Sequence, residues 1–136
     1  MSRPLDTTVI PVKVNVLIID DSGFSRRMLR QILEGAGYEV DEATGGFEAL
    51  ERYSLKRADV VLLDIIMDGM AGLEVLERLR ELDHGAKVLV ATADTQTATR
   101  QEAEAAGAMG MIRKPFDKEQ VLGAVLAVVA GGVAWN

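Results

Sequence analysis

Residues 59–64 read DVVLLD, and the four apolar residues between the two aspartates follow one another without a polar interruption. A strand covered by helices on both faces has this pattern, because neither of its faces meets solvent. The segment 38–43 reads YEVDEA, in which Tyr38 and Val40 alternate with Glu39 and Asp41, as expected for a strand at the edge of a sheet. The chain is therefore predicted to contain a buried central strand and a more exposed edge strand.

Strand-length apolar runs alternate five times with longer segments of helical period. The predicted strands are 13–20, 38–43, 59–64, 87–93 and 109–113. The predicted helices are 24–35, 45–54, 71–82, 95–106 and 117–130. This alternation is typical of an α/β domain with a doubly wound parallel sheet, and right-handed crossovers with an edge second strand favour the order 2-1-3-4-5. In that order the ligand crevice lies at the carboxyl ends of the first and third strands.

The length of 136 residues predicts one domain at 13–130, preceded by a flexible tail at 1–12 and followed by a short tail at 131–136. No cysteine is present, which excludes disulfides and thiolate zinc sites and suits a cytoplasmic location. The net charge of −6 argues against direct binding of nucleic acid. No stretch approaches the roughly 20 apolar residues of a membrane span, so we expect no membrane insertion.

Polar residues close four of the five predicted strands, and these strand ends should converge at one edge of the sheet. The residues are Asp20, Asp21, Asp64, Thr92 and Lys114. A single aspartate after a strand is often no more than a helix cap. The same chemistry at four converging strand ends favours a functional site.

Three carboxylates at one edge repel one another, by roughly 4 kcal/mol per pair at 4 Å with an effective dielectric near 20. A cation is therefore expected among them, and carboxylate oxygens favour Mg²⁺ over metals that prefer nitrogen or sulfur. His84, the only histidine, lies in a predicted surface turn and is assigned no role.

Four stretches together resemble the response regulator receiver domains of two-component signalling, particularly the free-standing regulators of chemotaxis type. They are LIIDDSGFSRRML, VVLLDIIMDGMAGLEVL, VLVATAD and GAMGMIRKPF, in this order and at the spacing of the family. The resemblance covers about residues 13–130 and implies a flavodoxin-like fold.

The resemblance implies that Asp64 accepts a phosphoryl group from a phosphohistidine on a sensor histidine kinase or phosphotransfer protein, or from a small phosphodonor. It also implies that Lys114 and Thr92 contact the phosphoryl oxygens. The implied Mg²⁺ ligands are Asp20, Asp21, Asp64 and the backbone carbonyl of Ile66. A cis peptide bond is implied at Lys114–Pro115.

The chain departs from the family pattern near this site. Asp68 stands where a proline is usual, and Met111 stands where an aromatic switch residue is common. A methionine can fill the same space with more conformational freedom. Ile66 and Asp94 occupy the positions that tune loss of the phosphoryl group, and an apolar Ile66 predicts slow loss because it hinders attacking water.

The segment from Val121 to Trp135 contains no charged residue. Apolar surface of this kind often marks a partner site. We therefore expect residues 95–130 to bind a second copy or an output protein, and the candidate interface residues are Val121, Leu122, Val125, Leu126 and Val129. The alternative is that the terminal GGVAWN folds back and covers the helix, with Trp135 as a plug.

These features predict a signalling switch that does not turn over an outside substrate. One alternative is a receiver-like interaction module that is never phosphorylated. A Mg²⁺-dependent phosphohydrolase is disfavoured, because Ile66 stands where such enzymes carry a second aspartate. The sequence leaves open whether the domain is free-standing or part of a longer regulator.

Overall fold

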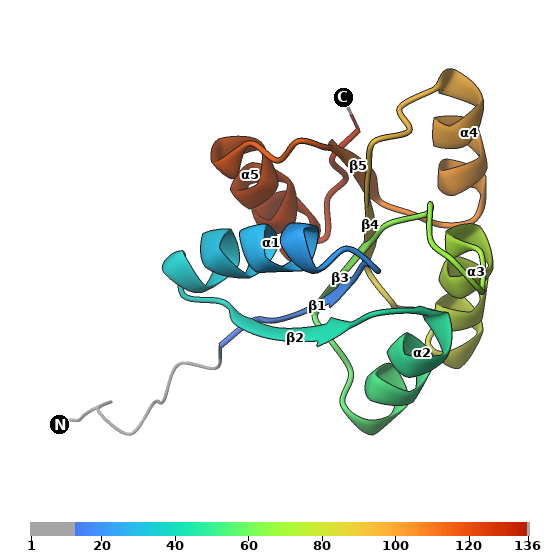
Figure 1. Cartoon of the computed structure of the whole chain (residues 1–136), viewed down its shortest axis with the longest axis horizontal. Helices are drawn as coiled ribbons and strands as arrows, with labels where there is room; N and C mark the ends of the chain where they lie inside the picture. The colour runs from blue at the N-terminus through green and yellow to red at the C-terminus, as the bar shows by residue number, and fades with distance from the viewer. Residues whose placement is uncertain (1–12, 136) are drawn as a thin grey trace, which may run out of the picture.

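The computed structural model describes residues 13–135, so the predicted flexible tail at 1–12 lies outside the described residues. Five strands alternate with five helices along this part of the chain (Figure 1). The strands are β1 Asn15–Ile19, β2 Glu39–Ala43, β3 Val60–Leu63, β4 Val88–Thr92 and β5 Gly110–Arg113. The helices are α1 Gly23–Gly35, α2 Gly46–Leu55, α3 Gly72–Leu82, α4 Thr97–Ala105 and α5 Lys118–Val129.

The strands form one parallel sheet in the order β2-β1-β3-β4-β5, which confirms the predicted order and the edge position of β2. Helices α1 and α5 cover one face of the sheet, and α2, α3 and α4 cover the other (Figure 1). Each predicted element exists, and its bounds differ from the prediction by no more than two residues. Because all strands run the same way, their carboxyl ends share one edge.

Two layers of core lie on opposite faces of the sheet. Val16 and Ile18 of β1 pack toward α1 and α5, while Leu17 and Ile19 pack toward the other three helices. Successive side chains of a strand point to opposite faces, so an uninterrupted apolar strand supplies both layers. All four residues of β3 are likewise buried, as its sequence predicted.

Helix α5 corrects part of the predicted apolar interface. Val121 and Val125 lie on the face of α5 that packs against the sheet and are fully buried, so the expectation that they form exposed surface is wrong. Leu126 is 64% exposed, and Leu122 and Val129 are half-buried. The uncharged part of α5, from Val121 to Val129, therefore has one stripe buried against the sheet and is not a wholly exposed apolar surface.

The chain turns back after α5. Ala134 forms a parallel bridge with Gly110 at the outer edge of β5.

Among residues 13–135, no helix has the length and apolar content needed to cross a membrane.

Candidate functional site at the carboxyl edge of the sheet

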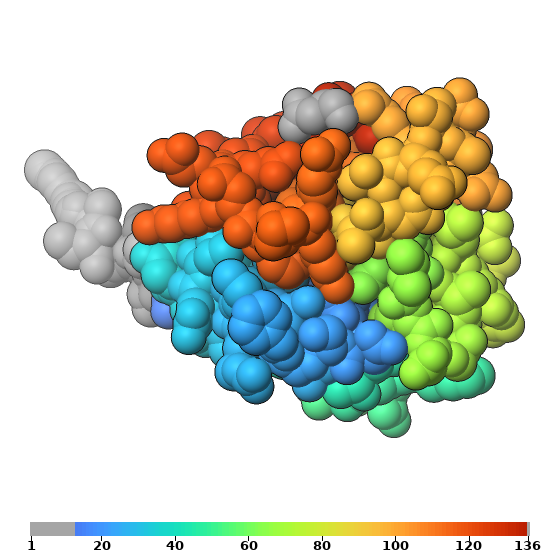
Figure 2. Space-filling view, turned by 45° about the horizontal axis from the view of Figure 1, so that its top comes forward, coloured from blue at the N-terminus to red at the C-terminus, as the bar shows by residue number. Residues whose placement is uncertain are grey.

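The sheet brings Asp20, Asp64, Thr92 and Lys114 to one edge. The backbone N–H of Asp64 donates to the Ile19 carbonyl at 2.9 Å, which sets the first residue after β3 beside the end of β1. The N–H of Lys114 donates to the Thr92 carbonyl at 3.0 Å. Figure 2 shows the segments that follow β1, β3, β4 and β5 meeting on one face, in blue, green, yellow and orange.

Lys114 joins the two buried carboxylates. Its Nζ lies 2.8 Å from Asp20 Oδ2 and 2.7 Å from Asp64 Oδ2. Asp20 is only 1% exposed and Asp64 only 5%, so solvent screens their mutual repulsion poorly. One ammonium group therefore lies against both carboxylates and offsets one of their two negative charges, so a net negative charge remains that a cation can neutralise.

The environment of Lys114 shifts its own ionisation. Burial lowers the pKa of the ammonium group, but its close contacts with the Asp20 and Asp64 carboxylates outweigh this effect, so the pKa lies above its ordinary value. Lys114 consequently remains a positive charge at the site across the physiological pH range.

The remaining carboxylate oxygens are held by backbone N–H groups. Ser22 donates to Asp20 Oδ1 at 2.9 Å, and Ile66 donates to Asp64 Oδ1 at 2.9 Å. Asp20 Oδ2, in contrast, is buried and accepts no well-aligned hydrogen bond, although the Lys114 ammonium is close. A buried oxygen of this kind has unused capacity to bind a cation.

Asp21 lies apart from this pair. Its side chain is exposed and accepts a hydrogen bond from the Asp68 N–H at 3.1 Å, which ties the loop after β1 to the loop after β3. Asp68 is also exposed. Within residues 13–135, no three acidic, histidine or cysteine side chains already surround a common point as metal ligands.

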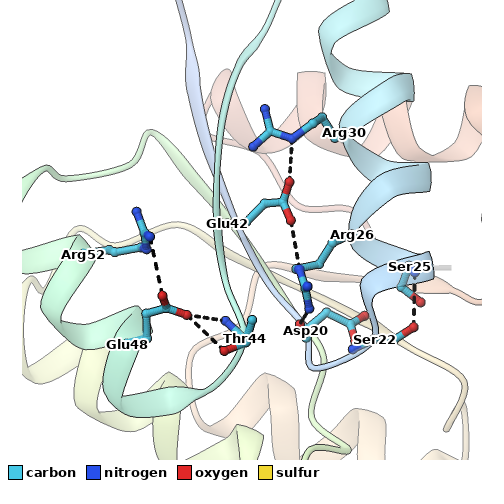
Figure 3. A network of polar contacts seen from close by, with 9 residues as sticks. All are labelled: Asp20, Ser22, Ser25, Arg26, Arg30, Glu42, Thr44, Glu48 and Arg52. Carbon is cyan, nitrogen blue, oxygen red and sulfur yellow. Dashed lines mark hydrogen bonds and ion pairs between the residues drawn. The ribbon is translucent and has the colours of Figure 1, made fainter.

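An ion-pair network that the sequence did not reveal supports the loop after β1 (Figure 3). Arg26 in α1 donates to the Asp20 carbonyl at 2.8 Å and to Glu42 at 2.9 Å. Glu42 of β2 also pairs with Arg30 of α1. The network joins the backbone of Asp20 to α1 and, through Glu42, to β2. In the sequence, the one sign of such a network is that α1 carries arginines and β2 carries acidic residues.

Thr92 connects the site to α4. The Thr92 hydroxyl is fully buried and accepts a hydrogen bond from the Asp94 N–H at 3.2 Å. The Asp94 carboxylate in turn accepts from Gln96 N–H at 3.2 Å and from the Thr99 hydroxyl at 2.8 Å. Asp94 therefore holds the start of α4 in register with the end of β4.

The other predicted residues surround this core of the site. Ile66 is 58% exposed beside Asp64, and Met111 of β5 is half-buried against the core under α3 and α4. The Lys114–Pro115 peptide bond is cis, which confirms that prediction. His84 is exposed, in agreement with its assignment to a surface turn.

A lysine between two buried aspartates at the carboxyl edge of a 2-1-3-4-5 sheet defines an α/β protein with an acidic site. The chain belongs to the response regulator receiver domain family, which its sequence matches over residues 16–126. Proteins of this family serve two-component signalling and are not classed as enzymes.

Relatives and solved structures agree with this assignment. The chain is 43% identical to chemotaxis protein CheY of Thermotoga maritima, over 81% of this chain and 92% of that protein. The structure of chemotaxis protein CheY4 of Vibrio cholerae superposes with a TM-score of 0.83 at 35% identity, covering 86% of this chain and 99% of that chain. The CheX–CheY–BeF3–Mg²⁺ complex of Borrelia burgdorferi gives a TM-score of 0.81 at 36% identity, covering 84% and 87%.

Proposed function

We propose that this chain is a phosphorylation-activated switch in which Asp64 accepts a phosphoryl group from a histidine kinase or phosphotransfer protein. The observation that carries the proposal is the Lys114 ammonium, 2.7 Å from Asp64 and 2.8 Å from Asp20 at the ligand-binding edge of the fold. A fixed positive charge beside a buried carboxylate stabilises negative charge that develops on a transferred phosphoryl group.

The transfer uses groups of this chain in distinct roles. An Asp64 oxygen attacks phosphorus, the new O–P bond forms, and the P–N bond to the donor imidazole breaks. The imidazole nitrogen keeps the electron pair and takes up a proton. Lys114 binds an oxygen of the phosphoryl group, and the Thr92 hydroxyl turns from Asp94 toward another.

The residues at the site fit Mg²⁺. All candidate ligands are oxygen atoms, and the buried Asp20 Oδ2 accepts no well-aligned hydrogen bond. Asp20, Asp21, Asp64 and the Ile66 carbonyl would hold the ion, and the ion would supply neutralisation of charge on the phosphoryl oxygens. The solved complex of the Borrelia relative includes Mg²⁺ and BeF3 in its name, which supports this ligand chemistry.

The proposed output is a change in the surface formed by α4, β5 and α5, which would control a partner protein or a second copy. The contact from Thr92 through Asp94 to Thr99 supports this, because it joins the site to α4 by hydrogen bonds. Phosphorylation then stabilises a second conformation, in which the Thr92 hydroxyl has left Asp94 for the phosphoryl group. A cytoplasmic location belongs to the same proposal.

Incubation with Mg²⁺ and acetyl phosphate, followed by intact-mass measurement, tests the function. The chain is expected to gain the mass of one phosphoryl group, and Asp64→Asn should abolish the gain. Asp68→Asn is the matched control, because Asp68 is an exposed aspartate near the site and should keep the gain. A chain that gains no mass would favour the unphosphorylated interaction module, and a gain that survives Asp64→Asn would identify another acceptor.

A further inference from the structure

The segment 131–135 runs along the outer edge of the sheet. Gly131 has φ of 89°, a left-handed conformation that glycine adopts without strain, and the chain reverses direction there. The Gly132 N–H donates to the Ala127 carbonyl at 2.8 Å, which closes the end of α5. The two glycines therefore direct the following residues back over β5.

Ala134 pairs with β5 as an additional strand would. Its N–H donates to the Met109 carbonyl at 2.8 Å, and its carbonyl accepts from the Met111 N–H at 3.2 Å. A Cβ atom at Gly110 would lie only 2.5 Å from the Ala134 oxygen, so the close approach requires glycine in the strand. The edge of β5 and the segment 131–135 thus fit each other closely.

Trp135 extends this contact to α4. Its side chain is half-buried against the same core cluster as Met111, and its ring lies 5.4 Å from the Arg100 guanidinium carbon. A guanidinium at that distance from an indole ring is attracted to it. Residues 131–135 therefore bind to both β5 and α4, on the surface that the proposed function assigns to the output.

A continuous set of contacts joins this segment to the phosphorylation site. The Thr92 hydroxyl, which turns toward the phosphoryl group in the proposed function, is bonded to the Asp94 N–H. The Asp94 carboxylate holds Thr99, and the next residue is Arg100. A shift of Thr92 therefore acts on the part of α4 that contacts Trp135.

We propose that residues 131–135 are an autoinhibitory strap, which covers the α4–β5 surface at rest and is displaced when Asp64 is phosphorylated. The inference rests on the proposed function and adds a regulated occupant of its output surface. Beyond the end of α5, the strap is held by the two backbone hydrogen bonds of its bridge to β5, by the ring contact with Arg100 and by the packing of Ala134 and Trp135, so it can open without unfolding the domain.

The fluorescence of Trp135 tests the strap directly, because Trp135 is the only tryptophan of the chain. The full chain is incubated with Mg²⁺ and acetyl phosphate, and quenching by acrylamide is measured alongside the intact mass. We expect phosphorylation to shift the emission to the red and to increase quenching. Asp64→Asn should show neither change.

Ala134→Pro removes the N–H that bonds to Met109 without altering the domain beneath. Before phosphorylation, Trp135 of this variant should be as accessible to acrylamide as Trp135 of the wild type is after phosphorylation. Val133→Ala is the control, because Val133 is exposed and the change should leave quenching as in the wild type.

Two results would overturn the strap. Equal quenching of the resting wild type and Ala134→Pro would mean that the segment is not docked. Complete phosphorylation by mass with unchanged quenching would mean that it is not released, and this would leave the proposed function standing. Absence of any mass gain would instead remove the proposed function and the release together.

Discussion

Replacement of Lys114 by methionine should expose the electrostatic cost of the site. Asp20 Oδ2 and Asp64 Oδ2 both lie within 2.8 Å of Lys114 Nζ. They can therefore be no more than about 5.5 Å apart, where two like charges repel by about 3 kcal/mol at an effective dielectric near 20. Removing one partner of a buried ion pair generally costs about 3–5 kcal/mol. We expect Lys114→Met to lower the free energy of unfolding by about 3 kcal/mol when no divalent cation is present.

The assay is urea unfolding followed by circular dichroism, with EDTA or with saturating Mg²⁺. In the wild type, the ammonium group already offsets one of the two negative charges, so Mg²⁺ competes with it and stabilises only modestly. In Lys114→Met, binding to the native state alone should restore about 2.7 kcal/mol when Mg²⁺ exceeds its dissociation constant a hundredfold. The variant is therefore expected to gain more stability from Mg²⁺ than the wild type.

Lys118→Met removes the same charge from an exposed position at the start of α5 and serves as the control. It should change the free energy of unfolding by less than about 0.5 kcal/mol. If Lys114→Met in EDTA were as mild as this control, the two carboxylates would not share the lysine in solution, and the electrostatic reasoning would be refuted.

Three further results are expected. Gly72→Ala should lower the free energy of unfolding by about 1–3 kcal/mol, because a Cβ there would lie 2.2 Å from backbone after β3, whereas Gly123→Ala, which meets no atom within 4 Å, should not destabilise. Tyr53→Phe removes the 2.6 Å hydrogen bond from the Tyr53 hydroxyl to Asp83, and this bond lowers the pKa of the Asp83 carboxyl in the wild type. The bond therefore stabilises the fold at a pH above the unfolded pKa near 3.8, and this stabilisation is lost as the pH falls through the lower folded pKa. The free energies of unfolding of variant and wild type, measured with urea, should accordingly converge in acid. Ile66→Asn should speed loss of the phosphoryl group several-fold in a time course of intact mass, and an unchanged rate would contradict the role of Ile66 as a barrier to water.

Much of the fold could be predicted because local pattern and global topology agree. The unbroken apolar run of β3 and the alternation in β2 follow from how many faces of each strand are covered, so strand order could be inferred from pattern. The convergence of Asp20, Asp64 and Lys114 followed from the parallel direction of the strands. The exposed surface of α5 was less predictable, because the uncharged run from Val121 to Val129 does not indicate which of its faces contacts the sheet.

The amino-acid sequence determined the α/β architecture, the residues at the carboxyl edge and the membership of a receiver family, since periodicity and motif spacing are local properties. Only the tertiary structure decided that Lys114 lies between two aspartates while Asp21 faces outward, and that Arg26 and Glu42 brace the loop after β1. It also decided that residues 131–135 pair with β5. These contacts join residues far apart in the sequence, and their geometry depends on side-chain directions and loop paths that no local pattern specifies.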